Sequence, residues 1–316
     1  MPSERAPFVS VVVCTRNRAE LLEKALLSLA DQDIGPDGHE ILLVDNASTD
    51  ATPEVARRLS ARLPLRYLRE ERIGLCIARN RGWRAARGEI VAYFDDDAVA
   101  EPGWLAAIRD VFRRDDAGKI GIVGGPVVPI WLGPRPDWLE DPIACSLTIV
   151  DWGKVEKAIT DLDREWLVGA NMAIPHRVLE EVDGFHPSLD RIGDNLLSGG
   201  DVHLAKKIIR RGYECRYLPA MAIRHLVPPA RLERAWFTRR FYWQGVSDAV
   251  MVLVDREPRP KRRLGLALRR LGALLADRAR LRALIFSGAS ARDFTQKCFG
   301  LIDLGFIMGL LGVARR

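Results

Sequence analysis

The first hundred residues alternate between short apolar runs and segments in which apolar residues recur at helical spacing. Continuous apolar runs are typical of strands buried on both faces. Recurrence every three or four positions is typical of amphipathic helices. The predicted strands are residues 8–13, 40–44, 65–68 and 89–94, and the predicted helices are residues 19–31, 52–62 and 74–86. Strand and helix in this order indicate a parallel sheet with right-handed crossovers.

The remainder of the chain is less regular. Residues 124–136 are rich in turn formers. Beyond them we predict a helix at 201–211, a strand at 213–218, and at 222–225 the last strand of the same sheet. From residue 228 the chain becomes helical and rich in arginine, and the predicted elements there are a linker at 256–263 and helices at 264–286 and 291–313. We therefore expect an α/β domain at 1–227 and a helical C-terminal region at 228–316.

Composition narrows the class of protein. The chain has 316 residues, of which 48% are hydrophobic and 28% charged, which is typical of a globular protein with one large domain or two modest ones. Its five cysteines are scattered without a CxxC pair, which argues against a disulfide framework or a zinc site. The N-terminus shows no apolar signal core. We expect a cytoplasmic protein.

Polar clusters directly follow three of the predicted strands. These clusters are Thr15-Arg16-Asn17, Asp45-Asn46-Ala47-Ser48 and Asp95-Asp96-Asp97. Because ligands bind at the carboxyl ends of parallel strands, we expect the clusters to converge on one edge of the sheet. Adjacent carboxylates repel one another unless a cation offsets their charge, and Mg²⁺ or Mn²⁺ takes such oxygen ligands together with substrate phosphates. The alternative for the aspartates is a solvated turn in which Asp97 caps the next helix, and we favour metal binding because an apolar strand leads into the cluster.

These motifs resemble the family-2 glycosyltransferases of the GT-A fold. The similar segments are residues 9–17, 44–50, 80–82 and 93–97, in the family's order and spacing, and the likeness extends over about residues 8 to 225. The resemblance implies an α/β fold with a Rossmann-like, mostly parallel central sheet flanked by helices, here with a C-terminal helical extension. It makes residues 1–227 a catalytic domain, with a nucleotide-binding half at about 1–97 and an acceptor half at about 98–227. It also implies transfer with inversion from a nucleotide-sugar, with UDP expected first, to a saccharide or lipid-linked acceptor in cell-surface glycan synthesis.

The resemblance also implies site residues at the matching positions. The expected nucleotide and donor residues are Thr15, Arg16, Asn17, Asp45, Asn46, Ser48, Arg79, Asp95 and Asp96. The expected ligands of Mg²⁺ or Mn²⁺ are Asp97, Asp95 and His225. The expected acceptor residues are Trp166, Gly169, Ala170 and Asn171, and the expected general base is Asp201.

Several of these roles have structural alternatives. Asp201 matches the Asp of the family's Gly-Glu-Asp-x-x-Leu motif, but Gly200 replaces its Glu. Asp201 would also serve as a helix N-cap, and Asp194 is the spare candidate for the base. For His225 the roles of ligand and structural residue stay open, and Trp166 is either a sugar-stacking residue or part of the core.

The C-terminal region suggests contact with a membrane. Residues 298–313 are apolar but too short to span a bilayer, and Asp303 interrupts them. Residues 264–284 are amphipathic and basic, which favours a helix lying on the inner face of an anionic membrane. The alternative is a helical pair that packs on the catalytic domain or in a homodimer.

Two other functions compete with glycosyl transfer. A nucleotidyltransferase acting on a sugar phosphate would carry a glycine-rich, lysine-bearing loop near its N-terminus, and residues 14–18 contain no glycine. A non-catalytic carbohydrate- or nucleic-acid-binding protein would draw on the eight tryptophans and the basic tail. The ordered acidic clusters would repel phosphates, so we expect no nucleic-acid partner.

Overall fold

The computed structural model describes residues 7–35, 38–191, 195–286 and 290–313. The chain forms two compact units. The first, called the sheet unit, comprises Met1–Ile130, Val150–His186 and Asp201–Leu226. The second, called the helical unit, comprises Trp131–Ile149, Pro187–Gly200 and Val227–Arg316. The helical unit thus includes two segments that precede residue 228.

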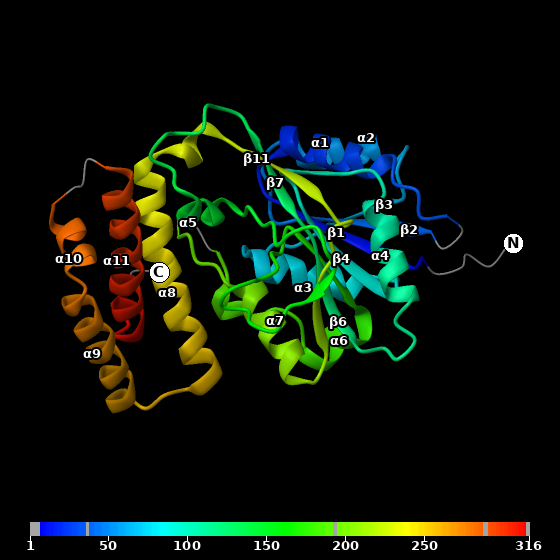
Figure 1. Ribbon diagram of the computed structural model, residues 1–316. Coiled ribbons are helices and arrows are strands. Elements are labelled where there is room, and N and C mark those ends of the chain that lie inside the picture. The colour runs from blue at the N-terminus through cyan, green and yellow to red at the C-terminus, as the bar shows by residue number, and fades with distance from the viewer. Residues whose placement is uncertain (1–6, 36–37, 192–194, 287–289, 314–316) are drawn as a thin grey trace, which may run out of the picture. The chain divides into compact units, whose positions relative to one another are not determined.

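The sheet unit is built on an eight-stranded mixed sheet (Figure 1) with the order β3-β2-β1-β4-β9-β6-β10-β8. Its strands are β1 (Val9–Thr15), β2 (His39–Asp45), β3 (Leu65–Arg69), β4 (Ile90–Asp95), β6 (Ile120–Gly124), β8 (Lys157–Ala158), β9 (Asn171–Pro175) and β10 (Glu214–Tyr217). β1 pairs in parallel with β2 and β4, whereas β9 runs antiparallel between β4 and β6. The predicted α/β class and mostly parallel sheet are therefore confirmed.

The faces of the sheet on which the first helices lie follow from right-handed crossovers between the strands. The helices of the sheet unit are α1 (Ala19–Ala30), α2 (Thr52–Leu59), α3 (Leu75–Ala85), α4 (Trp104–Arg113), α6 (His176–Val182) and α7 (Gly200–Arg210). β2 and β3 are added in turn on one side of β1, and β4 is then added on the other side of β1. Right-handed connections in both directions place α1 and α2 on one face and α3 on the other, as Figure 1 shows.

One predicted strand belongs to a different sheet. Residues 222–225 were expected to complete the central sheet, and this was wrong. Instead β11 (Ile223–Val227) lies in a separate three-stranded sheet between β5 (Ala98–Ala100) and β7 (Val127–Trp131). β5 begins only three residues after β4 ends, so the chain leaves the central sheet at the acidic cluster. Its antiparallel pairing sets His225 opposite Ala98, directly beside that cluster.

The helical unit consists mainly of α8 (Arg234–Arg256), α9 (Pro260–Ala276), α10 (Arg278–Ile285) and α11 (Ala291–Leu310), with the short α5 (Asp141–Ala144). The linker between α8 and α9 comprises residues 257–259 and is shorter than the predicted linker at 256–263. The single helix predicted at 264–286 is two helices, because Asp277 ends α9 and caps α10 by accepting the Arg280 N–H. Within the described residues, none of the helices combines the length and apolarity that crossing a membrane requires.

Glycines allow α8 and α11 to pack backbone against backbone. A Cβ at Gly245 would lie 2.0 Å from the Ile302 carbonyl oxygen, and one at Gly305 would lie 2.0 Å from the Tyr242 carbonyl oxygen. Any larger residue would have to push the two helices apart. We expect Gly305→Ala to lower the free energy of unfolding by about 1–3 kcal/mol, the usual effect of overpacking a well-packed contact.

The matched control is Gly272→Ala on α9, where a Cβ would meet nothing within 4 Å. That change should be neutral or stabilising by up to about 1 kcal/mol, because alanine has the higher helix propensity. Thermal unfolding followed by circular dichroism measures both variants. Equal effects of the two substitutions would contradict the close α8–α11 contact.

Candidate functional site

The polar clusters meet at one edge of the central sheet, as predicted. In the register of the parallel strands, Thr15 lies opposite Asp45 and Cys14 lies opposite Asp95. Because β1, β2 and β4 run in the same direction, their carboxyl ends place all three clusters side by side. The candidate site is therefore built on rigid strand ends, with loops beyond them.

A carboxylate–imidazole cluster lies at the end of β4. One ligand atom each from Asp95, Asp97 and His225 lie within 4.8 Å of one another. The His225 Nε2 is 3.1 Å from an Asp97 oxygen. His225 is 1% exposed, and its Nδ1 has no hydrogen-bond partner among the described residues. Two buried donors and the half-buried Asp95, gathered in this way, offer oxygen and nitrogen ligands that suit a divalent cation.

Asp96 is occupied by neighbouring side chains. The Thr15 hydroxyl donates to one of its oxygens at 2.7 Å, and the Arg18 guanidinium donates to the other at 2.9 Å. Burial and the nearby Asp97 outweigh the attraction of Arg18, and they raise the pKa of Asp96 to about 6. Asp96, which directly follows β4, therefore links the end of β4 to the end of β1 through Thr15.

Arg18 is a site residue that the sequence analysis missed. Its guanidinium contacts Asp97 at 3.1 Å as well as Asp96, so one cation lies across two buried carboxylates. These carboxylates, led by Asp96, raise the pKa of Arg18 above its ordinary value despite its burial. The sequence feature that could have identified Arg18 is its position directly after Thr15-Arg16-Asn17, at the edge of the sheet where ligands were expected.

Asp45 and Asn46, two of the expected nucleotide residues, hold the loops that follow β2 and β3 by hydrogen bonds. Asp45 is fully buried and accepts hydrogen bonds from the Ser48 N–H, the Tyr67 hydroxyl and Arg69. Asn46 accepts the Gly74 N–H and donates to the carbonyl oxygens of Glu70 and Arg72. The sequence analysis missed Tyr67 and Arg69, which sit on β3 beside Asp45.

The loops after β1 and β2 are tied to each other. The Asn17 N–H donates to the Ser48 hydroxyl, and the Thr49 N–H donates to the Asn17 side-chain oxygen. Asn17 and Ala47 both adopt left-handed backbone conformations, which fits a tightly shaped pair of turns. Arg16 and Asn17 are exposed, whereas Thr15, Asn46 and Ser48 are buried.

Arg79 connects the acidic cluster to Gly169, one of the expected acceptor residues. Its guanidinium lies 3.2 Å from Asp95, 5.4 Å from the centre of the Phe185 ring, and against Gly169. A Cβ at residue 169 would come within 2.3 Å of that guanidinium, so any larger residue there would displace the guanidinium from its present position. Burial acts to lower the pKa of Arg79, but the carboxylates of Asp95 and Asp201 outweigh it and raise that pKa.

Asp201 lies next to the same loop. Its two carboxylate oxygens accept the Gly169 N–H at 3.0 Å and the Val202 N–H at 2.9 Å. Asp201 is inside the first turn of α7, which begins at Gly200. The contacts Asp95–Arg79–Gly169–Asp201 therefore bring the expected base and the acidic cluster into one neighbourhood. Asp194, the spare candidate, lies outside the described residues.

The other expected acceptor residues are engaged in packing. The Trp166 ring meets Trp152 edge to face, with centroids 4.9 Å apart. Ala170 is 1% exposed. Asn171 is fully buried, accepts the Trp104 indole N–H and donates to two backbone carbonyls. Gly169, the fourth, contacts both Arg79 and Asp201.

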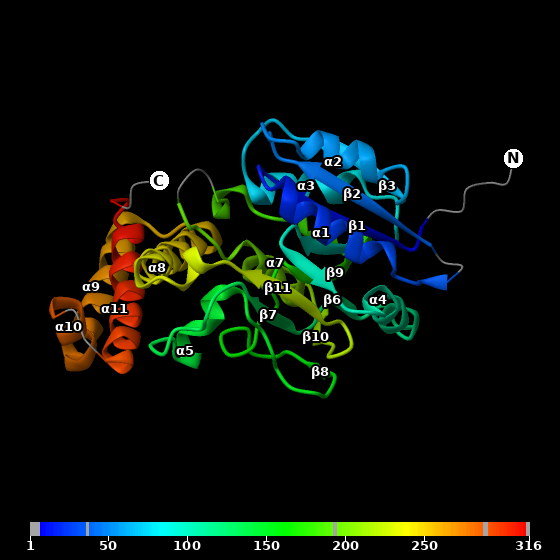
Figure 2. The ribbon, with the colours of Figure 1, turned by 90° about the horizontal axis from the view of Figure 1, so that it is seen from above.

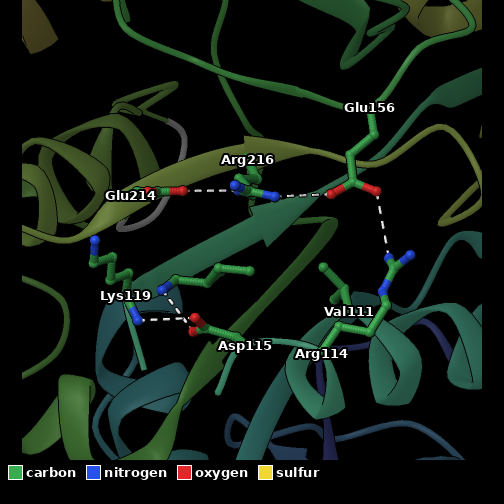
Figure 3. Close-up of a pocket in the computed structure, with 8 residues that line it drawn as sticks. Val111, Arg114, Asp115, Lys119, Glu156, Glu214 and Arg216 are labelled. Atoms are coloured by element: carbon green, nitrogen blue, oxygen red, sulfur yellow. Dashed lines mark hydrogen bonds and ion pairs between the residues drawn. The ribbon is translucent and has the colours of Figure 1, made fainter. Parts of the chain in front are cut away.

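A charged cavity of about 330 Å³ lies elsewhere in the sheet unit (Figure 3). Ile120 and Glu214, at the starts of β6 and β10, belong to its lining. Those strand starts are at the edge of the sheet opposite to the acidic cluster. The charges around the cavity pair with one another, as the contacts from Glu156 to Arg114 and Arg216 show. The cavity is therefore separate from the candidate site.

Comparison with known proteins identifies the family. Residues 10–181 match the family described as Glycosyl transferase family 2, which is more than half of the chain. The chain belongs to glycosyl transferase family 2. The predicted resemblance is confirmed, and this protein is a glycosyltransferase.

Two relatives from Haloferax volcanii match over most of their length. The glucosyl-dolichyl phosphate glucuronosyltransferase is 26% identical to this glycosyltransferase over 250 residues, covering 78% of each chain. Glycosyltransferase AglE is 28% identical over 295 residues, covering 88% of this chain and 91% of the relative.

Solved structures share the fold of this glycosyltransferase. The mannosyltransferase PcManGT from Pyrobaculum calidifontis, solved in complex with GDP-Man and Mn²⁺, aligns with a TM-score of 0.62 at 25% identity, covering 98% of this chain and 88% of that one. S. aureus TarS 1–349 aligns with a TM-score of 0.52 at 16% identity, covering 95% and 91%. The predicted GT-A fold is thereby confirmed.

Proposed function

We propose that this glycosyltransferase moves a sugar from a nucleotide-sugar to a lipid-linked or saccharide acceptor, with a divalent metal ion and with inversion at the anomeric carbon. One observation carries the proposal. The cluster of Asp95, Asp97 and His225 lies at the carboxyl end of β4, and Arg79 and Gly169 connect it to Asp201. A cation site and a carboxylate base side by side are what displacement of a nucleoside diphosphate needs.

The residues present fit a divalent cation. Asp95, Asp97 and His225 would hold it, since they supply carboxylate oxygens and an imidazole nitrogen. The bound ion would neutralise the charge that develops on the departing diphosphate. Mg²⁺ prefers oxygen ligands, so a donor set with an imidazole favours Mn²⁺. PcManGT was solved with Mn²⁺, which supports this choice.

Asp201 is the proposed general base. The acceptor hydroxyl forms a bond to the anomeric carbon while the bond from that carbon to the diphosphate breaks, and the Asp201 carboxylate takes the hydroxyl proton. The Gly169 and Val202 N–H groups orient the carboxylate. Arg79 holds the Gly169 loop beside Asp95. A single displacement of this kind inverts the anomeric configuration.

The names of the similar proteins narrow the choice of nucleotide-sugar donor and of acceptor for this enzyme. The sequence analysis favours UDP, but PcManGT carries GDP-Man, so both bases belong in any test. The name of one Haloferax relative includes a dolichyl phosphate, which supports a lipid-linked acceptor here. A lipid-linked acceptor would in turn bring the enzyme to the membrane surface as a peripheral protein.

Metal-dependent binding of the donor tests the proposal. Thermal unfolding should be measured with UDP-, GDP- and dTDP-sugars, each in Mn²⁺, Mg²⁺ or EDTA. We expect the cognate donor to raise the melting temperature with Mn²⁺, less with Mg²⁺ and not at all in EDTA. At about one hundred times its Kd, a ligand stabilises the folded state by about 2.7 kcal/mol.

Donor hydrolysis under the same conditions should follow the same order of metals. Binding that is equally strong in EDTA would contradict the metal site. Release of pyrophosphate from a nucleoside triphosphate and a sugar phosphate would instead indicate a nucleotidyltransferase.

A further inference from the structure

Helix α9 has an exposed apolar stripe. Leu264, Leu268, Leu271 and Leu275 are 51%, 57%, 37% and 55% exposed. Their spacing of four, three and four residues places them within about 60° of one another at roughly 100° per residue. We call these four residues the leucine stripe. At the end of α10, Ile285 and Phe286 are also about two-thirds exposed.

The stripe is not the face with which α9 packs in its own unit. Ala267 and Leu274, on another side of the helix, are the buried residues of α9. Within the helical unit, α11 packs against α8 on one side and against α9 and α10 on the other, so α9 and α10 form an outer layer (Figures 1 and 2). A contiguous exposed apolar face of this kind marks an interaction site.

The charged residues in the segment that carries the stripe are almost all basic. Between residues 258 and 286 the only acidic residue is Asp277, which caps α10 and pairs with Arg280. The same segment contains nine basic residues. Six of these are exposed, namely Arg259, Lys261, Arg262, Arg269, Arg278 and Arg282.

This combination selects one kind of partner. A lipid surface offers acyl chains to the leucines and, where its headgroups are anionic, opposite charge to the arginines. A second copy of the chain would cover the leucines, but it would also bring two basic helices against each other, which opposes association. A nucleic acid would match the charge but would leave the leucines in water.

We propose that the leucine stripe and the exposed basic residues around it form a docking surface for anionic membranes, with α9 lying in the plane of the interface. The proposal rests on the helical unit alone and does not depend on the metal or on Asp201. Four leucines that enter the boundary of the acyl chains supply the apolar part of the binding. The arginines and Lys261 supply the part that depends on headgroup charge.

Co-sedimentation of the full chain with vesicles tests the proposal. Vesicles of phosphatidylcholine alone should be compared with vesicles that also contain phosphatidylglycerol. We expect binding to the anionic vesicles, weakened at about 0.5 M salt because the charges are screened. Changing all four stripe leucines to glutamine should weaken binding at least about tenfold. Lys261→Glu should weaken the preference for anionic lipid, because Lys261 is exposed and lies about 60° from Leu264 around α9, beside the stripe.

The matched control changes four exposed apolar residues outside the stripe to glutamine, namely Leu27, Val128, Leu132 and Val155. It should bind vesicles as the unchanged protein does, and circular dichroism should show that both fourfold variants are folded. Binding should persist in EDTA and in Asp97→Ala, which separates this proposal from the catalytic one. Equal loss in the control, or a leucine-dependent dimer that ignores vesicles, would overturn the proposal.

Discussion

Changing Asp97 to alanine is expected to abolish sugar transfer and the metal-dependent binding of the donor. Asp97 is buried, and its oxygens lie 3.1 Å from His225 and 3.1 Å from Arg18. Its loss removes a proposed ligand from the cluster and the carboxylate beside His225, whereas Arg18 keeps its contact with Asp96. Because a catalytic metal contributes several kcal/mol to stabilising the transition state, we expect kcat to fall at least about a thousandfold.

Calorimetry with the nucleoside diphosphate, in Mn²⁺ and in EDTA, measures the binding part of this prediction. The variant should show the same weak affinity under both conditions. Asp110→Ala is the matched control, since it removes a half-exposed aspartate that pairs with Arg109 on α4. It should transfer sugar at the normal rate. If Asp97→Ala keeps near-normal, Mn²⁺-stimulated transfer, the proposed metal site is wrong.

The second large effect is expected for Asp201→Asn. The asparagine side chain keeps the shape and one acceptor oxygen for the Gly169 N–H, but its amide cannot take a proton from the acceptor hydroxyl. A positioned general base contributes about a hundredfold to ten-thousandfold in rate, so kcat should fall by about that factor. The Kd of the donor should stay nearly unchanged, because Arg79 and Gly169 lie between Asp201 and Asp95, the expected donor residue.

Single-turnover transfer and donor binding, measured on the same preparation, separate these two effects. Asp163→Asn is the control, because it removes an exposed carboxylate that pairs with Lys206 of the same helix α7. Normal transfer by Asp201→Asn would exclude this residue as the base. Loss of donor binding together with transfer would show that Asp201 supports the fold of the site and does not act on the acceptor.

Much of the donor half could be predicted because its pattern is local. Buried parallel strands read as continuous apolar runs, and residues 8–13, 40–44 and 89–94 are such runs. The clusters at Thr15, Asp45 and Asp95 then had to share an edge once the strands were parallel. The C-terminal helices were also predicted, although their break at Asp277 was not.

The acceptor half could not be predicted as well because its strands are short and pair with distant partners. β9 runs antiparallel between two strands that lie earlier in the chain, and β11 pairs with the three-residue β5. Local spacing carries no information about such pairing. Asn171, which the resemblance places on the acceptor side, is fully buried and bonded to Trp104 and two backbone carbonyls, and local spacing could not show these contacts.

The sequence by itself determined the family, the parallel core and the acidic cluster after β4, because those features depend on residues close together in the chain. Only the tertiary structure decided that His225 lies beside Asp97, that Arg18 spans two aspartates, and that Arg79 and Gly169 join Asp95 to Asp201. These contacts bring together residues up to about 130 positions apart, and strand pairing and close packing create them.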